Sequence, residues 1–300
     1  MVVILGFILG LVLGSFAKAI ADRSLTNRSF WGRSYCLKCK KTLAWYDLLP
    51  VFSYILLKGK CRSCHKKIPI EYFLIEVVMG VLVGFLFWQT FNNLQFTIYN
   101  LQFSFQLSTV LLDLILKIFF ITILAILFIT DIKDMFIPDR VIIPAIKIAL
   151  LYIIVETVYK IGYLYYYLTR TELGKILLSR SDYFQRHAFY TAEPALYAIL
   201  TGLGIGAFFF SLIILTRGKG MGGGDVKLGA LMGVVLGFPN AAVAVVLSFL
   251  TGAIFALALI LVGKKRFGEH IAFGPFLVLG SLMVMFWGDK LINWYLRLAK

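Results

Sequence analysis

Acidic residues are scarce in this chain, which holds 15 Asp and Glu against 30 Lys and Arg and has a formal net charge of +15. Charged residues make up 15% of the sequence, whereas soluble globular domains carry about 25%. Hydrophobic residues make up 60%. This composition excludes an ordinary soluble domain. It predicts an all-α protein that crosses a lipid bilayer several times.

Nucleotide-binding motifs are also missing. The chain has no G-x-x-x-x-G-K-[ST] sequence, and Gly218 to Gly223 satisfies G-x-G-x-x-G only formally. A dinucleotide fingerprint requires a preceding strand and an acidic residue about 20 positions later, whereas apolar segments flank this one. The basic charge invites a nucleic-acid hypothesis, but a membrane protein concentrates Lys and Arg in its cytoplasmic loops. We therefore expect no nucleic-acid partner.

Apolar runs predict about eight membrane-spanning helices. The first occupies residues 1–17 and begins with sixteen uncharged residues, which favours a retained helix over a cleaved signal peptide with its basic start. A basic loop follows over residues 18–71. Residues 72–300 are then predicted to form a membrane-embedded core of about seven helices, of which the one near Leu228 to Phe238 is short.

The distribution of basic residues predicts the orientation of the chain. Twelve Lys and Arg lie between Lys18 and Lys67 against two Asp, and Lys264, Lys265 and Arg266 mark a later basic turn. Both segments should face the cytoplasm. The connection over 92–108 has no Lys or Arg, and the segment over 169–193 has mixed charge, so we expect both to be external loops.

All four cysteines lie in the basic loop as two C-x-x-C pairs, Cys36 with Cys39 and Cys61 with Cys64. Zn²⁺ takes four thiolates tetrahedrally, and each C-x-x-C turn presents two sulfurs to one ion. The spacing therefore predicts a structural zinc site. Disulfides, free thiols and redox catalysis are the alternatives, and a reducing cytoplasm disfavours disulfides. His65 adjoins the site but is surplus to a four-cysteine centre.

Four aspartates occupy the predicted cytoplasmic ends of helices. Asp225 directly follows the glycine run that starts at Gly220, and the other three are Asp131, Asp134 and Asp139. One interpretation is that each is a hydrated interfacial carboxylate paired with a nearby Lys or Arg. The other is a catalytic pair, in which one carboxylate stays protonated and its charged partner activates water. Sequence periodicity leaves the partner of Asp225 open.

The motifs resemble those of the type IV prepilin peptidases, a family of intramembrane aspartic proteases. The resemblance is carried, in order, by Gly14-Ser15-Phe16 with Arg23, by the cysteine module running to Glu76, by Asp131 with Ile137-Pro138-Asp139, and by Gly222-Gly223-Gly224-Asp225-Val226-Lys227. Phe273-Gly274-Pro275-Phe276 is similar too. The resemblance implies that Asp131 and Asp225 are the catalytic pair. It assigns Gly222, Gly223, Gly224 and Lys227 to the substrate and active-site loop, and Gly14, Arg23 and Glu76 to methyl transfer.

This resemblance implies an enzyme that cleaves the leaders of prepilins or pseudopilins at the cytoplasmic face of the bacterial inner membrane. It also implies N-methylation of the new N-terminus with S-adenosylmethionine. The sequence departs from the family at Lys18, where Asn is usual, and at Glu71 and Phe73, where Arg and Pro are usual. A membrane transporter with intramembrane aspartates is the alternative from another class. It would normally have two halves of similar hydropathy, which the sequence lacks.

Overall fold

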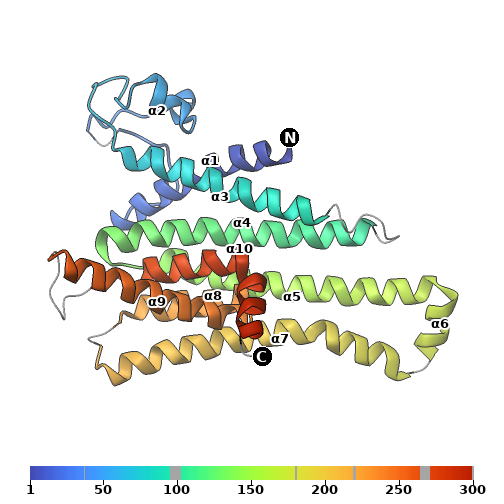
Figure 1. The fold of residues 1–300 in the computed structure, drawn as a ribbon. Helices are drawn as coiled ribbons and strands as arrows, with labels where there is room; N and C mark the ends of the chain where they lie inside the picture. The colour runs from blue at the N-terminus through green and yellow to red at the C-terminus, as the bar shows by residue number, and fades with distance from the viewer. Residues whose placement is uncertain (37, 95–102, 180, 219–220, 264–270, 299–300) are drawn as a thin grey trace. The chain divides into compact units, whose positions relative to one another are not determined.

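The computed structural model describes all residues except 37, 95–102, 180, 219–220, 264–270 and 299–300. The predicted basic turn at 264–266, residues 95–102 of the predicted external loop over 92–108, and Gly220 therefore lie outside the described residues. The other residues of that predicted loop belong to the helices on either side of it. The chain forms two compact units, residues 1–138 and residues 139–300 (Figure 1). Every regular element in the described part of the chain is a helix, which confirms the predicted all-α fold.

The first unit contains three long helices and a small loop module. Its elements are α1 (Val2–Leu25), the 3-10 helix η1 (Trp45–Leu48), α2 (Phe52–Leu56), α3 (Ile70–Leu94) and α4 (Phe103–Asp134). Helix α1 packs against both α3 and α4.

Glycines on α1 allow its backbone to approach α3 closely. Gly6, Gly10 and Gly14 recur every four residues and therefore lie on one face of the helix. A Cβ added at Gly10 would lie 2.3 Å from the backbone oxygen of Met79, and one at Gly14 would lie 2.8 Å from the Cα of Glu76. Small residues at this spacing are typical of close packing between membrane helices. The contact of Gly14 with α3 is thus part of this interface.

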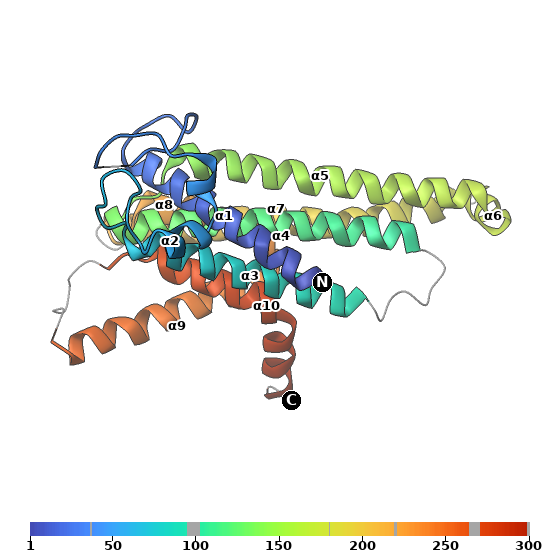
Figure 2. The same cartoon turned by 90° about the horizontal axis from the view of Figure 1, so that it is seen from above.

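The second unit is built around a short helix. Its elements are α5 (Asp139–Arg170), α6 (Glu172–Ser179), α7 (Ser181–Leu215), α8 (Gly223–Leu236), α9 (Asn240–Leu261) and α10 (Gly274–Leu298). Helix α8 contacts α5, α7, α9 and α10, and half of its residues are buried. Figures 1 and 2 show the small helix α6 at the turn that joins α5 to α7.

Seven helices of the described chain are long and apolar enough to cross a membrane. The remaining predicted segment, near Leu228 to Phe238, corresponds to α8, whose 14 residues fall short of the about 20 needed to span a bilayer. Each predicted segment therefore corresponds to a helix, seven of them long enough to span, and the prediction that this one is short is confirmed.

Two predicted boundaries were wrong. Helix α1 continues beyond residue 17 to Leu25, because Lys18 and Asp22 are one turn apart and their side chains pair within the helix. The segment over 169–193 is not a loop but contains α6 and the start of α7. Its mixed charge accompanies residues that readily form helices, so polarity alone does not indicate a loop there.

Candidate active site and metal centre

The two cysteine pairs adopt the same local structure. In the first, the Cys36 N–H donates to the Lys41 carbonyl and the Lys40 N–H donates to the Cys36 carbonyl. In the second, the Cys61 and His65 N–H groups make the equivalent bonds to Lys66 and Cys61. Lys40 and His65 occupy matching positions and have positive φ angles of 57° and 52°. His65 therefore serves as a turn residue in this arrangement.

The four sulfurs converge on one point. All lie within 4.8 Å of one another, and the Sγ atoms of Cys36 and Cys64 are 3.9 Å apart. A tetrahedral Zn²⁺ with Zn–S bonds of about 2.3 Å requires sulfurs about 3.8 Å apart, so the four residues fit such an ion. All four are free thiols, which gives no support to the disulfide alternative. The structure therefore contains a four-cysteine cluster suited to a metal.

The pKa values of two of these thiols are shifted in opposite directions. The backbone N–H of Cys39 lowers the pKa of Cys36 to about 6, which favours its thiolate. Although the backbone N–H of Lys66 acts to lower the pKa of Cys64, desolvation and the three neighbouring thiols raise it to about 11. Four thiolates cannot all ionise side by side unless a cation compensates them. A bound metal ion supplies that compensation.

A cluster of opposite charges joins the three long helices of the first unit. Lys18, on α1, is 1% exposed, and its Nζ lies 2.5 Å from Asp22 Oδ1 and 3.7 Å from Glu71 Oε2. Lys133, on α4, lies 3.0 Å from Glu71 Oε2 and 3.5 Å from Asp22 Oδ1. The hydroxyl of Tyr72 donates to Asp22 Oδ2 at 2.7 Å. Two cations and two anions thus balance one another.

This cluster explains how Lys18 and Glu71, two departures from the family pattern, are accommodated together. The buried ammonium of Lys18 has carboxylates on α1 and α3 as partners, and it lies 4.5 Å from the centre of the Tyr72 ring. Sequence reasoning missed the cluster. The spacing of Lys18 and Asp22 was a usable signal, but the contributions of Tyr72 and Lys133 depend on how the helices pack.

Two residues assigned by resemblance to methyl transfer hold the loop that follows α1. Arg23 donates from its guanidinium to the backbone carbonyls of Phe30 and Gly32. Glu76, on α3, is 8% exposed, and its Oε2 accepts a 2.7 Å hydrogen bond from the Val51 N–H. Val51 has φ 64°, a conformation that a β-branched residue rarely adopts. Together with the packing of Gly14 against α3, these contacts fix the loop that follows α1.

The two proposed catalytic aspartates are both buried at helix ends. Asp131 lies in the last turn of α4 and is 5% exposed, and Asp225 lies in the first turn of α8 and is 8% exposed. Asp134 and Asp139, the rival partners, are exposed. Asp131 belongs to the first unit and Asp225 to the second, so their pairing stays a prediction.

The start of α8 is organised around Asp225. Its Oδ2 accepts a hydrogen bond from the Gly222 N–H at 3.2 Å, and a negative side chain is favoured at the N-terminal end of a helix. Lys227 reaches Asp139 at the start of α5, with Nζ 2.5 Å from Oδ1. A Cβ at Gly223 would meet nothing within 4 Å. The ammonium of Lys227 thus connects two of the motifs identified in the sequence.

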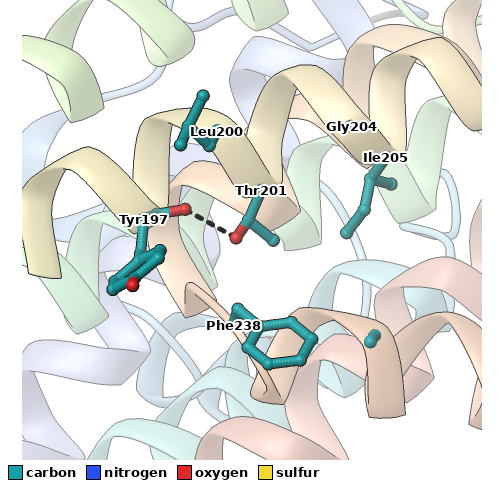
Figure 3. Close-up of a pocket in the computed structure, with 7 residues that line it drawn as sticks. Tyr197, Leu200, Thr201, Gly204, Ile205 and Phe238 are labelled. Carbon is teal, nitrogen blue, oxygen red and sulfur yellow. Dashed lines mark hydrogen bonds between the residues drawn. The ribbon is translucent and has the colours of Figure 1, made fainter.

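The second unit also has a groove away from Asp225, and its lining contains no acidic side chain. It has a volume of about 410 Å³ and lies between α7 and the α8–α9 turn (Figure 3). Its lining includes Leu200, Ile205 and Phe238, and the Thr201 hydroxyl donates to the Tyr197 carbonyl at 2.6 Å. None of its lining residues is acidic, so it does not contribute a carboxylate to catalysis.

Comparisons with known proteins agree with the motifs. Residues 8–90 match the Bacterial Peptidase A24 N-terminal domain, and residues 118–257 match the Type IV leader peptidase family. The chain is 29% identical to a prepilin leader peptidase/N-methyltransferase of Bacillus subtilis over 98% of this chain and 97% of the relative. It is 27% identical to the protein of that name in Vibrio cholerae, over 94% and 96% of the two chains. No solved structure matches significantly.

Proposed function

The chain belongs to the type IV leader peptidase family, and on that premise we propose that it cleaves the leaders of prepilins or pseudopilins with an aspartate pair, Asp131 and Asp225. Two relatives that match this chain over nearly their whole length carry the name prepilin leader peptidase/N-methyltransferase. We extend the proposal to methylation of the new N-terminus.

The burial of two of the four candidate aspartates carries the proposal. Asp131 and Asp225 are 5% and 8% exposed, whereas Asp134 and Asp139 face outward. A buried carboxylate is desolvated, which favours its protonated form, and a second carboxylate brought close strengthens that effect. An aspartic protease requires one protonated and one ionised acid, so the buried pair is the better choice.

The reaction follows from the two protonation states. The ionised aspartate takes a proton from water, and the water oxygen attacks the carbonyl carbon of the scissile peptide bond. The protonated aspartate donates to the carbonyl oxygen and stabilises the charge that develops there. The C–N bond then breaks and the departing nitrogen receives a proton, which yields a free carboxylate on the leader and a new N-terminal amine. The open space at Gly223 leaves room for the substrate backbone.

S-adenosylmethionine, when bound, supplies an electrophilic methyl group next to a positively charged sulfonium. Within the region assigned to methyl transfer, the buried side chain of Glu76 acts by holding the backbone of Val51 through its hydrogen bond. Gly14 contributes by packing α1 closely against α3, and Arg23 by binding the backbone of the loop that follows α1. In this proposal the three residues position the backbone of the methyl-transfer region.

The four-cysteine cluster is proposed to hold a structural Zn²⁺. The basic loop around it supports a cytoplasmic location, because Lys and Arg accumulate on that side of a membrane. We therefore propose that the protein resides in the bacterial inner membrane, with the cysteine module and the ends of α4 and α8 at the cytoplasmic face.

Co-expression of a prepilin with aspartate variants tests the proposal. Asp131→Asn and Asp225→Asn are each expected to abolish leader removal, measured by mass spectrometry of the pilin. Asp134→Asn is the matched control, because this exposed acid follows Asp131 by less than one turn. Normal processing by either the Asp131 or the Asp225 variant would overturn the assignment. The same spectra report methylation as the mass of one added methyl group.

A further inference from the structure

The loop module exposes a group of large apolar side chains to its surroundings. Trp45, Phe52 and Leu56 are 77%, 65% and 79% exposed. With their exposed neighbours they form what is here named the apolar patch: Trp45, Leu48, Leu49, Phe52, Ile55 and Leu56. Phe52, Ile55 and Leu56 stand at positions i, i+3 and i+4 and so share one face of α2. An exposed apolar group of this size in a membrane protein indicates a contact surface.

The opposite side of α2 fixes the depth of the patch along α3. The Tyr54 ring lies 5.4 Å from the ring of Phe73, and the Val51 N–H bonds to Glu76 at 2.7 Å. Glu76 is six residues into α3, or about 9 Å along the helix axis from Ile70. Helix α2 therefore lies beside the first turns of α3 and not beyond its end, as Figures 1 and 2 both show.

That depth corresponds to the boundary of a bilayer. Helix α3 has 25 residues and is about 37 Å long, whereas the hydrocarbon core is about 30 Å thick. The ends of α3 consequently extend among the lipid headgroups. An element held against its first two turns lies at the level where headgroups meet acyl chains. This level suits side chains such as Trp45 and Phe52.

The charge of the module selects the kind of lipid. Residues 26–69 contain ten Lys and Arg and one acid, Asp47. Arg62 pairs with that acid at 2.9 Å and also lies over the Tyr46 ring, so the module has a large positive excess. Lys58 and Lys60, just after α2, are exposed. Basic residues beside an inserted apolar face are attracted to anionic headgroups.

We propose that the apolar patch is a membrane-docking surface that inserts into the headgroup layer of a bilayer rich in anionic phospholipid. The flanking lysines bind the lipid phosphates. Docking anchors the cysteine module flat against the membrane at the start of α3. This proposal does not depend on the protein's catalytic activity.

Tryptophan quenching in nanodiscs tests the proposal on the full-length protein. The discs contain phosphatidylcholine alone or mixed with phosphatidylglycerol, with lipids brominated near the headgroup end or near the chain centre. The emission of Trp45 is obtained by subtracting the Trp45→Phe spectrum from that of the parent protein. We expect Trp45 to be quenched by the shallow bromines more than by the deep ones, and to a greater extent when phosphatidylglycerol is present.

A variant lacking the apolar face of α2 provides the specificity control. Phe52→Ser, Ile55→Ser and Leu56→Ser together should abolish lipid quenching of Trp45, while the protein keeps its metal. If this variant loses its metal, the dependence of quenching on phosphatidylglycerol in the parent protein decides instead. Emission from Trp45 that responds to aqueous iodide but to neither bromolipid would overturn the proposal. So would emission that changes only when a prepilin is added, which would assign the patch to substrate.

Discussion

Lys133 on α4 and Glu71 on α3 are joined by an ion pair of 3.0 Å, which fixes the end of α4 two residues after Asp131. Lys133 also lies 3.5 Å from Asp22 on α1, so one ammonium connects three helices. Because the last turn of α4 carries Asp131, the geometry of this ion pair bears on the position of a proposed catalytic acid.

Replacing Lys133 with Met should therefore reduce prepilin cleavage more than stability. Both partners are partly exposed, and such pairs contribute up to about 1 kcal/mol to the free energy of unfolding. We expect a small decrease in thermal stability and a severalfold decrease in kcat, with Lys133→Arg close to the parent. Lys117→Met is the matched control. Lys117 has a similar side-chain exposure but pairs with Asp113 on its own helix. Equal losses in the two variants would contradict this view.

The hydrogen bond between Glu76 and Val51 leads to a prediction about methyl transfer. Val51, a β-branched residue, has φ 64° and ψ −52°, a sparsely populated conformation that costs on the order of 1–3 kcal/mol in backbone strain. The bond to Glu76 holds Val51 in this conformation. Gln can accept the same bond through its carbonyl oxygen. We expect Glu76→Gln to retain methylation and Glu76→Leu to lose it, as seen in the mass of the mature pilin.

A second substitution tests whether the loss arises from the backbone. Glycine adopts positive φ without the steric strain that affects Val51. Val51→Gly should therefore restore part of the methylation lost in Glu76→Leu. If Glu76→Gln is as inactive as Glu76→Leu, the carboxylate charge and not the hydrogen bond is what the reaction needs.

If the four cysteines hold Zn²⁺ as proposed, removal of one sulfur should empty the site. Cys61 is buried and its Sγ lies within 4.8 Å of the other three, so serine at this position leaves an incomplete ligand set. We expect Cys61→Ser to lose bound zinc, measured by mass spectrometry of the metal, and the loop over 26–69 to become sensitive to protease. His65→Asn should keep its zinc, because Asn tolerates the positive φ of this turn. Loss of zinc from the His65 variant would indicate that His65 is a metal ligand.

Some of the fold and of the metal centre could be predicted because those signals are local. Long apolar runs and C-x-x-C turns determine their structures within a few residues. The helical stretch over 169–193 was missed because its charged residues resemble a loop in composition. The cluster of Lys18, Glu71 and Lys133 was missed because it requires three helices in register, which no local pattern encodes. The pairing of Asp131 with Asp225 rests on resemblance for the same reason.

The packing of Gly229 against Phe209 makes the position of α8 sensitive to a single methyl group. A Cβ at Gly229 would lie 2.4 Å from Phe209 Cδ2, and Phe209 is fully buried, with its ring 6.2 Å from that of Phe273. Because the Phe209 ring is fully buried and packs against the rings of Phe249 and Phe273, we expect Gly229→Ala to displace α8. Overpacking of this kind costs about 1–3 kcal/mol. Because Asp225 is one turn earlier on α8, cleavage should fall together with thermal stability.

Gly204→Ala separates this effect from a general cost of losing glycine in a membrane helix. Gly204 lies on α7, and an added Cβ there would meet nothing within 4 Å. Alanine in a helix interior is more favourable than glycine by about 0.5–1 kcal/mol, so this variant should be at least as stable as the parent and fully active. Steady-state cleavage and thermal melts of both variants in one detergent provide the measurement. A fully active Gly229→Ala protein would show that α8 tolerates displacement, and the close fit of α8 against Phe209 would then have no part in positioning Asp225.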